Sequence, residues 1–374
     1  MREFSGRNDI DSFVPSERSP MNLRFPGMRG VFAAAVLATP LLLGSVAYAG
    51  PAEQLTGTHR TTRSPLATIA VKAPEVFPHS ADYDPCTGSF LVGSLKKGTV
   101  TVVGRDGTAR TLVNDPTLVS VQGVRIDRER NRVLVTNVDL GTADTTSAAG
   151  PLKVAGVGSY DLRTGRRQWY TDLAAVAPTS TSHLAADVVV DADGTAYVVD
   201  TQSPTLFRVS RTGRASVLLT SPLLAGTPGL GVPGVLPDIA ASSIALVPGN
   251  LLIVAKGDGT LVRVPIQHPG QASVVKLDTG LVPLAASLRV LPDGSIAAVS
   301  SGLLTQKPAV VQRVRPDSSW RSAKVTVTDT VPDPITSGIT AGPHGSTYTV
   351  SGGLADLLQH QPNTGFTLRQ VRVS

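Results

Sequence analysis

The feature that most constrains the fold is a unit of short strands that recurs along the chain. In the clearest copy, residues 186–200, two apolar β-rich runs flank an Asp-Gly turn at Asp193 and Gly194, and two more apolar runs follow by residue 219. Similar copies start at His79, near Gln122, near Ala241, near Ala286 and near Ser337. A spacing of about 40 to 60 residues is the period of four-stranded propeller blades.

Six copies predict an all-β fold, a six-bladed β-propeller over residues 68–374. A single blade cannot bury both of its faces, so we expect the copies to pack in a ring, with the first strand of each lining a central channel. The composition agrees, because 36 glycines and 28 prolines supply many turns. A parallel β-helix would repeat nearer every ~20 residues, and a series of sandwich domains would lack a common Asp-Gly turn.

An apolar segment at residues 31–49 indicates export. Arg24 and Arg29 precede it, and it ends in an Ala-Tyr-Ala triplet, the small-x-small pattern of a signal peptidase site. We therefore expect a signal peptide at residues 1–49 and a secreted protein. A transmembrane anchor is the alternative, but Pro40 interrupts the segment, which is barely long enough to span a bilayer.

Two further features concern the residues before and after this apolar segment. Residues 1–20 are polar, which is unusual ahead of a signal peptide, so translation from Met21 is an open alternative. Residues 50–67 are rich in Thr, Arg, Pro and Gly without apolar periodicity, and they predict a flexible linker.

Charge and cysteine content limit the partners. The net charge of +6 comes from lysines and arginines that are scattered singly, without a basic run, so we expect no nucleic-acid partner. We also expect no stable membrane anchor and a monomeric protein. Cys86 is the single cysteine, so no disulfide can form within the chain.

Four segments carry a resemblance to a known family: residues 77–85, 187–200, 251–264 and 320–323. Residues 77–85 read Phe-Pro-His-Ser-Ala-Asp-Tyr-Asp-Pro, where the family reads Phe-Pro-Glu-Gly, an apolar pair and Tyr-Asp-Pro. In this order along the chain, they resemble the SMP-30, gluconolactonase and luciferin-regenerating-enzyme family of six-bladed propellers. The resemblance implies a Ca²⁺ or Zn²⁺ ion at the channel floor that polarises a lactone or ester carbonyl.

The positions that hold this metal in the family are mostly altered here. The resemblance places the family's Glu, Asn and Asp ligands on His79, Gln122, Ala186, the pair Ser242 and Ser243, and the pair Ala286 and Ser287. Alanine offers no ligand atom, and a hydroxyl is a poor substitute for a carboxylate on Ca²⁺. The inherited metal site is therefore expected to be dismantled.

Polar residues that remain at the strand starts are the candidate site. We assign His79 and Asp187 as candidate catalytic residues, and as candidate ligand-binding residues Gln122, His183, Ser242, Ser243, Ser287 and Ser337. One alternative is a rebuilt Zn²⁺ site of His79, His183 and Asp187. Another is a serine nucleophile with a histidine base and Asp187. In a third, these groups only satisfy backbone groups and water in a polar tunnel.

Two long connections are candidate covers for the channel. One follows Asn137 and Asp139 and runs to about residue 158, and the other spans the apolar, glycine-rich residues 223–236. The sequence thus predicts a secreted, lactonase-like propeller that binds a small molecule in its central channel and can hydrolyse an ester or lactone. The alternative is a non-catalytic propeller that binds a ligand, a glycan or a protein.

Overall fold

The computed structural model describes residues 66–305 and 307–373. The predicted signal peptide at residues 1–49 and most of the predicted linker lie outside these residues, so both stay predictions. Within the part that is described, no helix is long and apolar enough to cross a membrane.

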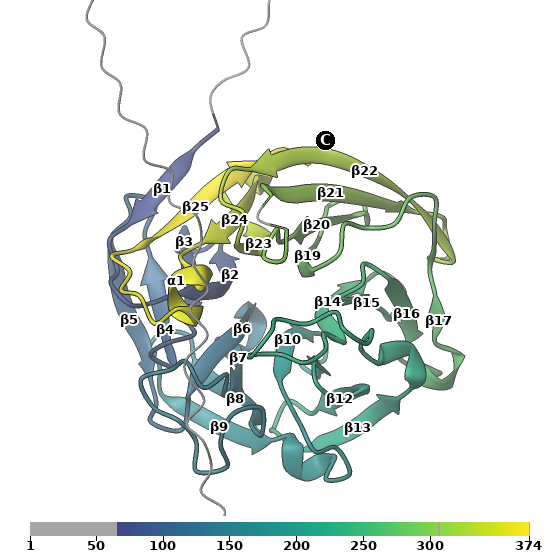
Figure 1. Ribbon diagram of the computed structural model, residues 1–374, viewed down its shortest axis with the longest axis horizontal. Helices are drawn as coiled ribbons and strands as arrows, with labels where there is room; N and C mark the ends of the chain where they lie inside the picture. Colours follow the sequence, from purple (N-terminus) through teal and green to yellow (C-terminus); the bar gives the residue numbers. More distant parts are fainter. Residues whose placement is uncertain (1–65, 306, 374) are drawn as a thin grey trace, which may run out of the picture. The chain divides into compact units, whose positions relative to one another are not determined.

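The strands form six sheets arranged as the blades of a ring (Figure 1). Listed from the channel outward, blade 1 holds β2 (Pro78–Asp84), β3 (Ser89–Ser94), β4 (Thr99–Val103) and β5 (Ala109–Asn114); blade 2 holds β6 (Ser120–Asp127), β7 (Arg132–Val138), β8 (Ala155–Asp161) and β9 (Arg167–Asp172); blade 3 holds β10 (Ala185–Val190), β11 (Ala196–Asp200), β12 (Thr205–Val209) and β13 (Ala215–Thr220).

The second half of the chain repeats this arrangement. Blade 4 holds β14 (Ala241–Val247), β15 (Leu251–Lys256), β16 (Leu261–Pro265) and β17 (Ser273–Val274); blade 5 holds β19 (Ala285–Val290), β20 (Ile296–Ser300), β21 (Ala309–Pro316) and β22 (Ser322–Val331), with β18 (Lys276–Leu277) parallel to β22 at its edge; blade 6 holds β23 (Thr336–Ala341), β24 (Thr347–Ser351) and β25 (Phe366–Val371). The predicted six-bladed propeller and its strand order are confirmed.

Blade 6 is completed by the strand at the start of the domain. β1 (Thr68–Val71) pairs antiparallel with β25, in the register Thr68 to Arg369 and Val71 to Phe366. A blade shared by both ends of the domain closes the ring. The predicted propeller boundary at residue 68 includes this strand, but the repeat does not identify its partner.

Apolar side chains hold neighbouring blades together. One cluster joins Leu134 of blade 2, Val188 and Leu206 of blade 3, and Val254 of blade 4, all fully buried. Fully burying such a side chain stabilises the fold by roughly 1.5–3 kcal/mol. The continuous apolar runs in the sequence follow from this, because an inner strand is covered on both faces.

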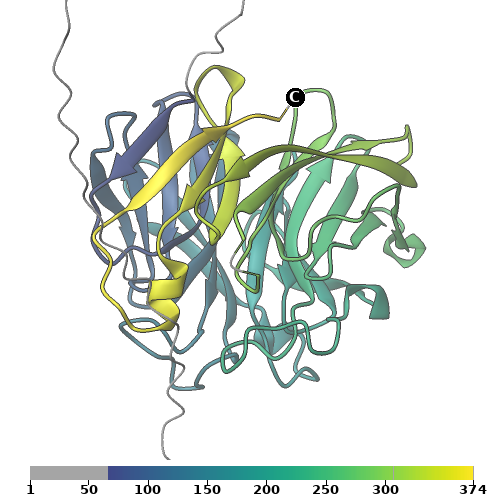
Figure 2. The same ribbon diagram turned by 45° about the horizontal axis from the view of Figure 1, so that its top comes forward.

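Short helices occupy the connections, and the longest connections lie on one face of the ring. The helices are η1 (Arg128–Arg130), η2 (Ala174–Val176), η3 (Pro222–Leu224), η4 (Pro269–Gln271), η5 (Pro343–Gly345) and α1 (Leu354–Leu358). The connections of residues 139–154, 221–240 and 352–365 all leave the ring at the end where the inner strands begin. Figure 2 shows α1 and the teal and green loops gathered on this lower side.

Candidate functional site

Each of the six inner strands contains a bulge near its start, where the inner strand has one residue more than the neighbouring strand that it pairs with. A bulge inserts an extra residue and re-aims side chains, and such bulges are common next to binding sites. The bulged positions form what we call the bulge ring: His79, Gln122, Ala186, Ser242, Ala286 and Ser337. These are the positions to which the family resemblance assigned metal ligands, with Ser337 added by blade 6.

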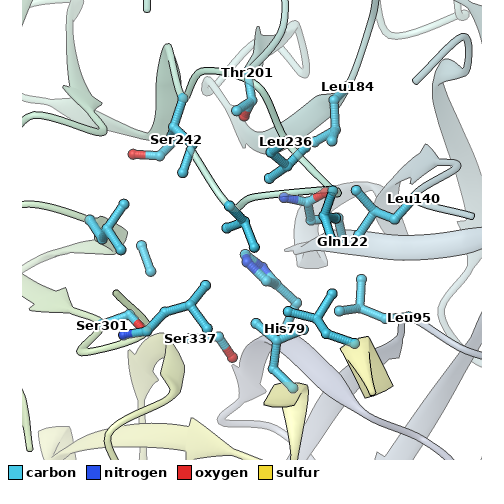
Figure 3. A pocket seen from close by; sticks show the side chains of 18 residues that line it. His79, Leu95, Gln122, Leu140, Leu184, Thr201, Leu236, Ser242, Ser301 and Ser337 are labelled. Carbon is cyan, nitrogen blue, oxygen red and sulfur yellow. The ribbon is translucent and has the colours of Figure 1, made fainter. Parts of the chain in front are cut away.

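A cavity lies over the bulge ring, on the face that carries the long loops (Figure 3). It encloses about 800 Å³, including the part open to solvent. Twelve of its eighteen lining side chains are apolar, and none carries a formal charge other than a histidine that can titrate. We call it the loop-side pocket. Five members of the bulge ring line it, and Ala186 does not.

His79 and Gln122 are adjacent in the floor of this pocket (Figure 3). Burial lowers the pKa of His79 to about 4, an effect that a hydrogen bond with the Gln122 backbone partly opposes. The imidazole is therefore neutral at pH 7, where it can both donate and accept a hydrogen bond.

The Gln122 side chain has a free acceptor. The residue is 8% exposed, and its Oε1 atom has no hydrogen-bond partner among the described residues. A buried carbonyl oxygen without a partner costs about 1–3 kcal/mol, so such atoms are rare without a functional reason. Gln122 therefore presents an unused acceptor to whatever enters the pocket.

Ser242 and Ser337 use their hydroxyl protons within the protein. Ser242 Oγ donates to the carbonyl of Ala285 at 2.7 Å, and Ser337 Oγ donates to the carbonyl of Pro78 at 3.2 Å. Both bonds join one inner strand to the next around the ring. Their oxygen lone pairs are left to accept a hydrogen bond from a ligand.

Asp187 lies one position beyond the bulge, and its side chain joins two blades. Its Oδ2 accepts hydrogen bonds from Ser243 Oγ at 2.7 Å and from the Ile244 amide at 3.1 Å. Burial raises the pKa of its carboxyl group. Ser243 continues the pattern, because its hydroxyl accepts from the Leu288 amide at 3.0 Å. Neither residue lines the loop-side pocket.

Hydrogen bonds between the residue after the bulge and the next inner strand join neighbouring blades. In blade 1, Ser80 also sits one position after the bulge and accepts a hydrogen bond from the Val124 amide of the next blade, at 3.1 Å. The catalytic role of Asp187 stays a prediction, while its bonds place it in the layer that fastens the inner strands together. Ser287, at the equivalent position, pairs with Val299 and does not line the pocket.

His183 lies apart from His79. Its Nδ1 is 2.8 Å from Asp200 Oδ2, and both side chains are almost fully buried. The hydrogen bond with Asp200 raises the pKa of His183. Asp200 Oδ1 also accepts from the Leu184 amide at 2.8 Å, so the pair anchors the start of β10. His183 does not line the pocket, and its predicted ligand-binding role is untested.

The apolar walls come from the loops. The predicted covering loops contribute, since Leu140 lies in the first and Val232, Val235 and Leu236 lie in the second. Leu354 and Leu358 of α1 also line the pocket, and neither is among the residues predicted from the sequence. The pair of glycines before Leu354 and the apolar spacing of four residues could have indicated a short helix with one apolar face.

The residues of the bulge ring do not fit the metal that the family resemblance implies. Ca²⁺ takes six to eight oxygen ligands, with carboxylates among them, and no carboxylate lines this pocket. The Zn²⁺ alternative needs His79, His183 and Asp187 together, but His183 is bonded to Asp200 and Asp187 to Ser243. Across residues 66–305 and 307–373 no group of three or more His, Cys, Asp or Glu side chains could hold a metal ion.

Comparisons with known proteins support the fold. No family model and no curated protein matches the sequence. Among solved structures, the major allergen Mala s 1 of Malassezia sympodialis matches with a TM-score of 0.64 and 18% identity, over 82% of this chain and 96% of that one.

Two further structures match with a TM-score of 0.50. A gluconolactonase of Xanthomonas campestris is 11% identical over 82% of this chain and 90% of that one, and the calcium-binding protein regucalcin of Agrobacterium tumefaciens is 15% identical over 83% and 96%. The resemblance to lactonase-like propellers is thus confirmed at the level of the fold.

Proposed function

We propose that the loop-side pocket binds a neutral, mainly apolar small molecule that donates a hydrogen bond to Gln122. One observation carries this proposal: a buried amide oxygen without a partner faces a pocket whose other walls are mostly apolar. A ligand donor at Gln122 Oε1 would satisfy the acceptor, and the apolar part of the ligand would be removed from water by the surrounding leucine and valine side chains.

The absence of charged side chains from the pocket lining narrows the ligand class. No lysine, arginine or carboxylate lines it, and the lowered pKa of His79 keeps its ring neutral, so an ionic ligand would lose its hydration without gaining a partner. A neutral ligand avoids this cost. The apolar lining favours such a molecule over a glycan or a protein surface.

A neutral fluorescent probe tests this proposal. N-phenyl-1-naphthylamine is apolar and carries one N–H donor, so we expect it to bind the purified propeller with a rise in fluorescence. Replacing Gln122 by Met removes the acceptor at similar volume and should weaken binding about fivefold to tenfold, the loss of roughly 1 kcal/mol. Gln271→Met, on the exposed helix η4, is the matched control and should bind as the unaltered protein does.

Competition then tests the charge preference. Decanol should displace the probe more effectively than decanoate, because only the acid carries a charge into an uncharged pocket. Equal displacement by both, or unchanged probe binding in Gln122→Met, would overturn the proposal.

Hydrolysis of an ester or lactone is the second candidate function. The observation in its favour is that the pocket floor holds a neutral imidazole, His79, which can accept a proton. The test is turnover of a panel of lactones and aryl esters, with and without added divalent ions. Turnover that disappears in His79→Gln would support hydrolysis, and turnover that persists would remove His79 from that role.

Secretion remains a proposal that rests on the sequence pattern at residues 1–49. Cleavage after Ala49 would leave Gly50 as the first residue of the exported protein, which N-terminal sequencing can check.

A further inference from the structure

A second cavity lies at the opposite end of the inner strands. It encloses about 780 Å³, including open space, and it is lined by the last residues of these strands rather than by the long loops. We call it the turn-side pocket, since short hairpin turns surround it. Each inner strand contributes the residue three positions after its bulge, and these six form the second ring: Asp82, Arg125, Val189, Ala245, Arg289 and Thr340.

The second ring carries an excess of positive charge. Arg125 and Asp82 approach each other at 3.8 Å, which is longer than a hydrogen bond. Arg289 donates to Thr347 Oγ1 and, at 3.5 Å, to the Gly345 carbonyl, but no carboxylate of the described chain lies within ion-pair distance of it. Within the second ring, two guanidinium groups and one carboxylate leave an excess of one positive charge. Asp82 also acts electrostatically on Arg289, and Asp187, in the layer behind the ring, acts on Arg125.

Arg289 is also partly removed from water. Burial lowers the pKa of its guanidinium, although the group stays charged. A guanidinium has five N–H donors in a planar fork, and the two bonds to Thr347 and Gly345 leave donors free to face the cavity.

Thr340 supplies a second, independent sign of a ligand. Its side chain is 3% exposed and lines the turn-side pocket, and its Oγ1 has no hydrogen-bond partner among the described residues. A hydroxyl can donate to an anion, and a buried hydroxyl without a partner is costly to keep. The Thr340 hydroxyl, which has no hydrogen-bond partner in the described chain, and Arg289, which has no ion-pair partner there, line the same cavity.

The remaining wall is apolar. Ile244, Leu246, Leu288 and Ile339 line the cavity beside the charged residues. Such a lining suits the hydrocarbon part of a ligand whose charged end meets the arginines.

We propose that the turn-side pocket binds a small organic carboxylate with an aliphatic or aromatic body. The carboxylate would accept from the guanidinium groups of Arg125 and Arg289 and from the Thr340 hydroxyl, and a single negative charge would balance the single excess positive charge. A doubly charged phosphate would instead bring its second charge against Asp82. This site is separate from the loop-side pocket, because the layer of Asp187 and Ser243 lies between the two rings.

Calorimetric titration with hexanoate tests the proposal. We expect saturable one-to-one binding that is at least tenfold tighter than binding of hexanamide, its neutral counterpart, and tighter than binding of inorganic phosphate. Arg289→Gln should weaken hexanoate binding at least tenfold, and Thr340→Val should weaken it about threefold. Arg208→Gln, at an exposed arginine of β12, is the matched control and should change the affinity less than twofold.

Three results would overturn the proposal. Hexanamide or phosphate could bind as tightly as hexanoate, or hexanoate could bind the Arg289→Gln and Thr340→Val proteins as it binds the unaltered one. Hexanoate could also be displaced by N-phenyl-1-naphthylamine, which would place it in the loop-side pocket. Thr340→Val keeps the test decisive if Arg289→Gln does not fold, because the threonine hydroxyl makes no bond that folding would lose.

Discussion

The two ends of the channel are built from the same six strands, yet they differ in chemistry. At the loop side, the bulge ring presents neutral groups, and long loops cover it with leucine and valine side chains. At the turn side, the second ring presents two arginines, an aspartate and an unpaired hydroxyl. Position along one strand, three residues apart, is enough to change a neutral site into a cationic one.

The connections explain much of this difference. Long connections at the loop side, such as residues 139–154 and 221–240, can fold over the channel and add apolar walls. The hairpins at the turn side, such as residues 85–88 and 191–195, are too short to reach across it. The loops therefore contribute to the lining of the loop-side pocket, whereas the turn-side pocket is lined by the ends of the inner strands.

The largest effect is expected from the layer that separates the two ends. Asp187→Ala should lower the free energy of unfolding by about 3 kcal/mol, because the Ser243 hydroxyl and the Ile244 amide lose a buried acceptor. Urea unfolding measures this change. Asp187→Asn retains an acceptor oxygen and should lose less than half as much. If Asp187→Ala were as stable as the unaltered protein, the hydrogen bonds of Asp187 would not contribute to the stability of the fold.

Acid is expected to act on the loop-side end with a smaller effect. The pKa of His79 falls from 6.5 in the unfolded chain to about 4 in the folded one, so as the pH falls the unfolded state binds the proton first. Stability is therefore full above pH 6.5 and decreases toward pH 4. We expect His79 to account for a loss of about 2 kcal/mol at pH 4.5, allowing for its partial exposure.

His79→Gln provides the comparison for this pH effect. Urea unfolding at pH 7 and pH 4.5 should show a smaller acid loss in His79→Gln than in the unaltered protein. His183 acts with the opposite sign, because its raised pKa gives stability that is present below pH 6.5 and lost as the pH rises through the folded value. Equal acid losses in both proteins would mean that His79 is not shielded from water in the pocket.

The sequence repeat locates the starts of the inner strands, for a physical reason. Propeller blades repeat, so the start of each copy locates an inner strand, and His79, Gln122 and Ser242 lie at bulges as their place in the copies suggests. With one bulge in each strand, the residue three positions after the bulge, such as Arg125 or Arg289, also lines the channel. The pattern is readable only once the bulge is known.

Other parts depend on contacts that no local pattern encodes. β1 pairs with β25 almost three hundred residues later in the chain, so its partner cannot be read from its own four residues. Leu354 and Leu358 lie outside the repeat, and only the closure of the ring brings α1 over the channel. The interblade bonds of Asp187 likewise depend on which strand becomes its neighbour.

The smallest effect distinguishes the two ends within one strand. Thr336 lies at the loop-side end of β23, and its hydroxyl donates to the Asp333 carbonyl at 2.9 Å, whereas the Thr340 hydroxyl at the turn-side end has no partner in the described chain. Valine has nearly the same shape as threonine. Thr336→Val should lower the free energy of unfolding by about 1 kcal/mol, because the hydrogen bond to Asp333 is lost. Thr340→Val should raise it by up to ~1 kcal/mol, because the threonine hydroxyl is bonded to water only in the unfolded chain. Thermal and urea unfolding of the two variants measure the signs. Opposite signs would show that the Thr340 hydroxyl is held at a cost to folding, as expected for a residue that serves a ligand, and equal losses would show that it contributes to the fold as Thr336 does.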